Sequence, residues 1–310
     1  MALRTRAHAP PAAMTLTDRI FLAYVAATGA LIAAFGWRLS VRLWIGLSLS
    51  HVVLLLLGTG LAHRAPHGRS PPGFVRDTYP LFFVPFLYWE IRYTAKLVSS
   101  GYHDALIQRL ELAVFGRQLA ITFSRWLPYP WLSEMMHFFY ATYWIMLPVA
   151  FVALYLRGRL DGFRELVFVE LALFLSCYLI YIFFPVAGPF YHFRPIGGRL
   201  ADGFFYRLVH GVLADGGSRG AAFPSSHVAV ALGISLVTWR YDRVVWAALT
   251  PLVVGLIFGT VYGRFHYGID ALSGVVFALA VVPVARWIWH RRRGPLGPGG
   301  VGNLANRSPV

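Results

Sequence analysis

Two histidine motifs carry the chemistry that this sequence could perform. The first is FPSSH, which ends in His227, and the second is RFHYGID, which contains His266 and Asp270. His266 and Asp270 are four residues apart, so on a helix they share one face, and the carboxylate can accept from one imidazole nitrogen while the other stays basic. This arrangement suits a nucleophilic histidine, although a purely structural His–Asp hydrogen bond would have the same spacing.

The FPSSH motif predicts the start of a helix, because Pro224 precedes two serines, the residue type that commonly caps helices. Ser225, Ser226 and the free backbone N–H groups of the first turn would present donors at the positive end of the helix dipole. A phosphate group fits such a site. Ordinary capping, with His227 at the membrane interface, is the alternative.

Two arginines are candidate ligands for phosphoryl oxygens. Segment 183–195, FFPVAGPFYHFRP, is broken by prolines and brings Arg194 to its end. A guanidinium can bind two phosphoryl oxygens at once, although Arg194 would equally suit a lipid headgroup. Arg264, two residues before His266, is a second candidate with weaker geometry, because residues two apart do not share a helix face.

The sequence does not indicate a metal site or another cofactor. His227, His266 and Asp270 lack a further acidic cluster, so they would make a poor cage for a divalent ion. The one cysteine, Cys177, lies in an apolar run, so no internal disulfide is expected.

The composition indicates that lipid surrounds most of this chain. Hydrophobic residues make up 57% of the sequence and charged residues 13%, against about 25% charged in an ordinary soluble domain. We predict an all-α, polytopic membrane helix bundle with about eight transmembrane helices, because a span needs about 20 apolar residues. The expected spans are residues 16–37, 41–62, 79–98, 135–156, 165–184, 225–239, 244–262 and 269–289.

Segment 79–98 has the weakest signal, because Glu90, Arg92 and Lys96 lie in its second half. Such groups face protein or water inside a membrane, or they mark a helix at the interface.

The net charge of +15 comes from short arginine clusters between apolar runs. No basic domain or aromatic-interleaved stripe is present that would hold nucleic acid. Most clusters fall in alternate loops, so the positive-inside rule predicts a multi-pass protein of the plasma (inner) membrane with both chain ends in the cytoplasm. Segments 183–195, 223–227 and 262–270 would then meet at the outer face.

Four regions are expected along the chain. Residues 1–15 and the basic residues 291–310 are predicted to be disordered tails, because they hold too few apolar residues to fold. Residues 16–98 would form N-terminal transmembrane helices, and residues 99–290 the membrane domain that carries the motifs. Within it, segment 102–125 has the pattern of an amphipathic helix that lies in the membrane interface or packs on the loops.

Taken together, PSSH, HYxxD, FPVAGPxY and the Arg-Pro pair resemble the type 2 phosphatidic acid phosphatase superfamily. More narrowly, FPVAGPFY, HYGID and segment 104–116 resemble the branch of inositol-phosphorylceramide synthases and their bacterial relatives, which are inositolphosphotransferases. The resemblance covers roughly residues 102–289 and implies a six-helix phosphatase-type core.

The resemblance also implies a reaction through a phosphohistidine that needs no metal. His266 would attack phosphorus, Asp270 would orient and charge it, and His227 would protonate the departing oxygen. The phosphoryl oxygens would be held by Ser226, the first-turn amides and Arg194, and the residue pattern adds Ser225 and Arg264 as further candidates.

Two departures from the family pattern remove phosphate-binding cations. Ala187 stands where the family has a lysine seven residues before Arg194, and Thr260 stands where it has an arginine six residues before His266. Either Arg264 compensates or the activity is weak.

We therefore predict a membrane enzyme that cleaves or transfers a phosphoryl or phospho-headgroup on a lipid, with a polyol as the acceptor in the case of transfer. The motif residues do not separate hydrolysis from transfer. Two non-enzymatic alternatives stay open: a transporter or lipid translocator with a polar path along Glu90, Arg92 and Lys96, and an inactive member of the fold. The richness in arginine and alanine is typical of a GC-rich bacterial genome.

Overall fold

The computed structural model describes residues 14–63 and 70–293, so the two predicted tails fall largely outside it. Within these residues the chain is all-helical. The α-helices are α1 (Leu16–Phe35), α2 (Val41–Ala62), α3 (Pro71–Val98), α4 (Asp104–Phe115), α5 (Leu119–Trp126), α6 (Pro130–Ala141), α7 (Tyr143–Leu156), α8 (Leu160–Phe183), α9 (Pro189–His192), α10 (Phe204–Gly216), α11 (Ser226–Tyr241), α12 (Arg243–Tyr262) and α13 (Gly268–Arg293), and the 3₁₀ helices are η1 (Gly36–Arg38) and η2 (Gly198–Ala201).

All eight segments expected to span the membrane are helical, but they are not alike. Among the described residues, α1, α2, α8, α12 and α13 are each long and apolar enough to cross a bilayer. Helices α6 and α7 reach that length only together, and they are bent by 46° at the break near Thr142. The protein is therefore a polytopic membrane helix bundle with five or six such spans.

The two remaining segments, α3 and α11, differ from the expectation for physical reasons. Helix α3 has 28 residues, but its second half carries Glu90, Arg92 and Lys96. Helix α11 has only 16 residues, short of the roughly 20 that cross hydrocarbon. Most of its side chains are buried against other helices, so protein more than lipid surrounds it.

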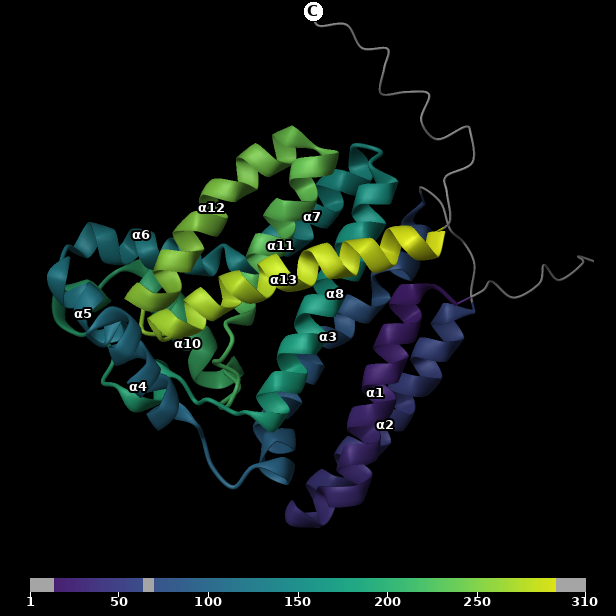
Figure 1. Ribbon diagram of the computed structural model, residues 1–310, viewed down its shortest axis with the longest axis horizontal. Coiled ribbons are helices and arrows are strands. Elements are labelled where there is room, and N and C mark those ends of the chain that lie inside the picture. The colour runs from purple at the N-terminus through teal and green to yellow at the C-terminus, as the bar shows by residue number, and fades with distance from the viewer. Residues whose placement is uncertain (1–13, 64–69, 294–310) are drawn as a thin grey trace, which may run out of the picture.

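Helix α8 lies at the centre of the bundle. In its most apolar 18-residue stretch, 72% is buried inside the protein. The helix packs against α1, α3, α7, α11 and α13. Figure 1 shows the α1–α2 pair on one side of α8 and α12 on the other. Helix α2 lies at the periphery and exposes large apolar side chains such as Leu49 and Leu56, as a lipid-facing helix does.

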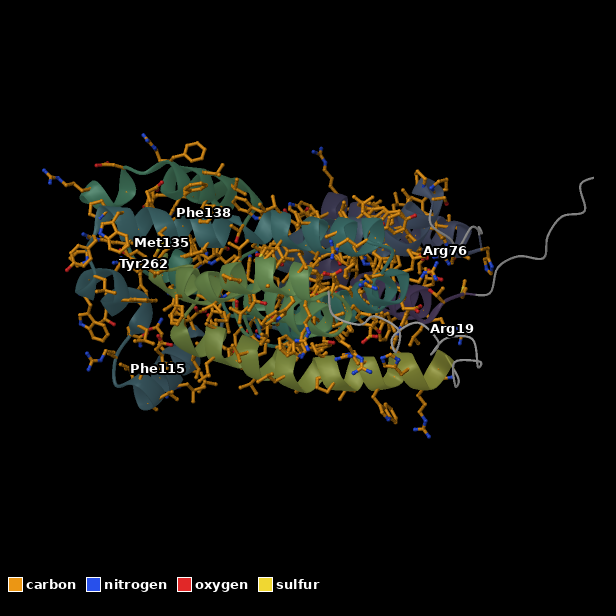
Figure 2. The ribbon with its side chains drawn as sticks, turned by 90° about the horizontal axis from the view of Figure 1, so that it is seen from above. Arg19, Arg76, Phe115, Met135, Phe138 and Tyr262 are labelled. Carbon is orange, nitrogen blue, oxygen red and sulfur yellow. The ribbon has the colours of Figure 1, made fainter. Side chains whose placement is uncertain are left out.

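The short helices gather at one end of the bundle. Figure 1 shows α4, α5, α6 and α10 together there. Figure 2 shows Tyr262 and Phe115 at this end, while Arg19 and Arg76 lie at the opposite end. The last residues of α12, the first residues of α11 and α13, and the loop after α8 all reach the end that holds the short helices.

Candidate active site

The two motif histidines face each other at this end of the bundle. His266 Nε2 lies 3.2 Å from His227 Nδ1, although the residues are 39 positions apart. Tyr140 brings its hydroxyl to 3.2 Å from the other nitrogen of His227, and the ring of Tyr143 lies 4.4 Å from the same imidazole. The sequence expectation that the motifs converge is confirmed by this geometry.

The hydrogen bonds select one tautomer for each histidine. His266 Nδ1 lies 3.0 Å from the carbonyl oxygen of Ala222, which can only accept, so the proton of a neutral His266 sits on Nδ1. Nε2 then accepts from His227 Nδ1–H, and His227 Nε2 accepts from the Tyr140 hydroxyl. Nε2 of His266 therefore carries a free electron pair when a substrate displaces His227, which is what a nucleophile requires.

Asp270 lies beside His266 in a different way from that expected. The sequence suggested a shared helix face, but α13 begins at Gly268, so His266 lies in the turn before the helix. The carboxylate Oδ2 is 3.6 Å from His266 Nδ1 and accepts a hydrogen bond from the backbone of Tyr267 at 2.9 Å. A separation of 3.6 Å is too long for a hydrogen bond. The buried Asp270 carboxylate therefore acts on His266 electrostatically, while the carbonyl of Ala222 accepts the hydrogen bond.

The turn that carries His266 is fixed by its own backbone. The amides of Phe265 and His266 both donate to the carbonyl oxygen of Thr260 at 3.0 Å. Arg264 adopts a positive φ of 62°, a conformation that costs a non-glycine residue energy and persists only where surrounding contacts enforce it. Its guanidinium supplies such contacts by donating to the Arg194 carbonyl at 2.5 Å and to Ser124 Oγ at 3.2 Å.

Helix α4 fastens two loops of the site through buried carboxylates. Asp104 accepts from the amides of Ala187 and Gly188, each at 2.8 Å, and from the Tyr267 hydroxyl at 3.1 Å. Burial next to Asp104 raises the pKa of Tyr267, so its hydroxyl remains a donor. Glu111 accepts from the amides of Gly268 at 3.0 Å and Ile269 at 2.7 Å, the first residues of α13.

Because these acids point inward, α4 turns its apolar side chains outward. Leu106, Leu110, Leu112 and Val114 are all exposed, whereas Asp104 and Glu111 are buried. The helix thus packs on the loops, as one of the two sequence alternatives required, and it also presents an apolar outer face.

A small cavity of about 40 Å³ opens beside the histidine pair. By the measure that about 10–15 Å³ holds one water molecule, it can take a phosphoryl-sized group. Its lining combines the histidines with tyrosines, one serine and small or apolar residues: Tyr88, Tyr140, Ala187, Phe190, Tyr191, Leu213, Gly217, Ser218, Ala221, Ala222, His227, Phe265 and His266.

A larger cavity of about 610 Å³ lies at the opposite end and is not the candidate site. It is lined by Arg19, Arg76, Arg164 and Arg292 but by no histidine. Arg76 pairs with Asp18 and Arg164 with Asp77, each at 2.7 Å, which is the pattern of a structural ion-pair network. The histidine pair therefore makes the smaller cavity the candidate site.

The comparison with protein families agrees with this geometry. The model of the PAP2 superfamily matches residues 109–284, more than half of the chain. The chain belongs to the PAP2 superfamily. Comparisons with curated proteins and with solved structures gave no match.

The residues suggested by the superfamily resemblance separate into two groups in space. His266, His227 and Asp270 come together, but Arg194 is exposed, and neither Arg194 nor Arg264 lines the cavity. Their role as phosphate ligands stays a prediction.

Polar groups in the first turn of α11 already have hydrogen-bond partners within the protein. Ser225 is buried, and its Oγ accepts from the Val228 amide at 3.4 Å. Tyr181 accepts from the Ser226 amide at 3.0 Å and donates to the carbonyl of Pro224 at 2.6 Å. The helix start was correctly predicted, and phosphate binding by these serines stays a prediction that would require these bonds to rearrange.

Several site residues were not found by sequence reasoning. Tyr140 and Tyr143 sit against His227, and Asp104 holds the loop before α9. A signal existed only for Asp104, since it begins the amphipathic segment 104–116 that the sequence analysis had singled out. The tyrosines lie in apolar runs where an aromatic residue predicts only packing.

Proposed function

We propose that this PAP2 superfamily member is a lipid phosphatase or phospho-headgroup transferase that works through a phosphohistidine on His266 Nε2. The observation that carries the proposal is the anchoring of His266 Nδ1 at the Ala222 carbonyl, which leaves Nε2 free and directed at His227 beside the cavity. Superfamily membership supports phosphatase or phosphotransferase chemistry.

In the proposed reaction a phosphoryl group enters between the two histidines. His266 Nε2 attacks phosphorus, so a P–N bond forms while the bond from phosphorus to the leaving oxygen breaks. His227 is neutral without substrate and becomes doubly protonated by taking the proton of a phosphoryl monoanion that binds beside it. It then gives the Nδ1 proton to the leaving oxygen, and the Tyr140 oxygen accepts from Nε2–H. Water or an acceptor hydroxyl then attacks phosphorus, loses its proton to His227 and releases His266.

A lipid is the proposed substrate because the cavity lies where several apolar helices end, and a span that ends there would bring a lipid headgroup close to it. Its small volume suits the phosphoryl group, while the rest of the lipid would stay outside. The finer assignment to the inositol-phosphorylceramide synthase-like branch, with a polyol acceptor, follows from the FPVAGPFY and HYGID strings.

Phosphate release tests the proposal. Purified protein in detergent and EDTA would be given a panel of lipid phosphates and pyrophosphates, and His266→Ala would be compared with His63→Ala, an exposed histidine in the loop after α2. We expect release by the wild type and by His63→Ala and none by His266→Ala. Equal release by both variants would refute nucleophilic catalysis by His266.

A second donor separates transfer from hydrolysis. If the wild type releases no phosphate, the same proteins would be given a phospholipid and labelled inositol. Labelled lipid that depends on His266 would establish a transferase, whereas no product in either assay would refute the enzymatic proposal in favour of a transporter or an inactive member.

The proposed outer-face orientation follows from the arginine pattern of the sequence and has its own test. A cysteine would be introduced at one of two exposed positions: at Arg199, which lies at the same end of the bundle as the cavity, or at Arg159, next to the start of α8. The native Cys177 is buried and should not be labelled. A membrane-impermeant maleimide added to intact cells should label Arg199→Cys only, and labelling of Arg159→Cys only would invert the orientation.

A further inference from the structure

The cavity presents a problem of charge. A phosphoryl group brings up to two negative charges into a largely buried site, and such a charge is costly unless cations or strong donors face it. No arginine or lysine is among the residues that line the cavity. Ala187, at the position of the superfamily lysine, is part of the wall.

Arg92 of α3 supplies a cation close to this wall. Its Nη2 donates at 2.6 Å to the carbonyl oxygen of Gly217, which lines the cavity. Its Nε is buried and has no hydrogen-bond partner. It forms no ion pair with any carboxylate in the described part of the chain. One donor of its guanidinium is used, the ring of Trp89 lies 5.8 Å from the guanidinium carbon, and no anion faces the charge. A half-buried, unpaired arginine in a membrane bundle is costly unless an anion joins it.

The loop from 217 to 219 adds a second cation and a free hydroxyl. Arg219 lies with its guanidinium carbon 5.6 Å from the ring centre of Tyr191, a cavity residue, and 5.0 Å from that of Tyr102. Ser218 is buried in the cavity wall, and its Oγ has no hydrogen-bond partner.

The pKa of Tyr191, a residue of the cavity wall, depends on both arginines. Burial raises the pKa of Tyr191, and the positive charges of Arg92 and Arg219 oppose that rise. The geometry agrees, because the guanidinium of Arg219 lies 5.6 Å from the Tyr191 ring centre and that of Arg92 binds the carbonyl of Gly217. Gly217 lies against the Tyr191 hydroxyl as well, since an added Cβ would come within 2.7 Å of it.

We propose that Arg92, together with Arg219 and Ser218, binds the non-reacting phosphoryl oxygens of the substrate at the mouth of the histidine cavity. This proposal rests on the proposed function and adds Arg92, which lies before the matched residues 109–284, to two residues within them. The N-terminal helices thereby become part of the active site. Arg92 and Arg219 take the place of the two cations lost at Ala187 and Thr260.

The role of Arg92 is to offer a planar fork of donors. Its Nε–H and remaining Nη–H groups can reach two oxygens of one phosphoryl group, whereas a lysine would provide a single point charge. Arg92→Lys should therefore keep part of the affinity, and Arg92→Gln should lose most of it.

Binding of inorganic phosphate tests the clamp without requiring turnover. Its affinity would be measured by calorimetry in the His266→Ala background, with Arg92→Gln, Arg92→Lys, Arg219→Gln and Ser218→Ala added singly. The matched control is Lys96→Gln, an exposed cation one turn further along α3. A charge-assisted hydrogen bond contributes about 1.5–3 kcal/mol, so Arg92→Gln should weaken binding on the order of tenfold to a hundredfold.

Each outcome bears on one proposal. Weaker binding in Arg92→Gln, an intermediate effect in Arg92→Lys and none in Lys96→Gln support the clamp, even if the wild type releases no phosphate from lipids. Unchanged affinity in a folded Arg92→Gln protein overturns the clamp, even if the wild type is an active phosphatase. Should Arg92→Gln not fold, unchanged affinity in both Arg219→Gln and Ser218→Ala overturns it, and a loss in either supports it.

Discussion

Replacing Asp104 by asparagine tests whether α4 holds the site together. The substitution keeps the shape of the side chain and removes its charge. Asp104 is only 3% exposed, and its two oxygens accept from the amides of Ala187 and Gly188, one each, at 2.8 Å. The Tyr267 hydroxyl donates to the same oxygen as Gly188, at 3.1 Å.

The magnitude follows from counting these donors. Asparagine has one carbonyl oxygen, so its NH₂ group must face either the Ala187 amide or the Gly188 amide, and a donor then meets a donor. One buried N–H is left without an acceptor, which costs about 1–3 kcal/mol. The surviving bonds lose their charge assistance, so the free energy of unfolding should fall by roughly 2–4 kcal/mol in all.

Thermal unfolding in detergent and phosphate release would be measured on the same preparations. We expect a lower midpoint and a reduced kcat for Asp104→Asn, because the displaced 185–188 loop forms a cavity wall through Ala187. Asp202→Asn is the matched control, since Asp202 is exposed before α10. An Asp104→Asn protein with the midpoint and kcat of the wild type would refute the role given to α4.

Three further substitutions test the site and its surroundings. Tyr140→Phe keeps the ring but removes the hydroxyl beside His227, so kcat should fall about tenfold, equivalent to about 1.4 kcal/mol, and steady-state kinetics with an unchanged kcat would contradict this. Burial next to another histidine lowers the pKa of His210 from 6.5 to about 4. As the pH falls from 6.5 to 4, His210 therefore takes up a proton in the unfolded chain before it does so in the folded protein, and the free energy of unfolding should decline. His210→Gln should show a shallower decline of the melting midpoint over this pH range. Gly188→Ala should lower the free energy of unfolding by about 1–3 kcal/mol, because Gly188 has a φ of 91° and an added Cβ would lie 3.0 Å from the Cβ of Ala222. The control is Gly197→Ala, which should leave the melting midpoint unchanged because nothing lies within 4 Å of an added Cβ there.

The sequence by itself determined the class of the protein and the convergence of its motifs. Apolar runs of span length predict helices because they reflect local composition, and all of those predicted runs are helical. Successive spans must alternate direction, so motifs at matching helix ends meet at one face. That rule brought His227 and His266 together without any knowledge of packing.

The tertiary structure decided which groups contact the histidines. The i, i+4 spacing suggested that Asp270 takes the His266 proton, but the Ala222 carbonyl, 44 residues away in sequence, is the nearer acceptor. Arg194 matched the motif yet is exposed and does not line the cavity, while Arg92, from a segment with no motif, binds a residue of its wall. Local pattern determines helices and caps, whereas partners distant in sequence are set by how whole helices pack, so the cations that lie next to the cavity could be located only in three dimensions.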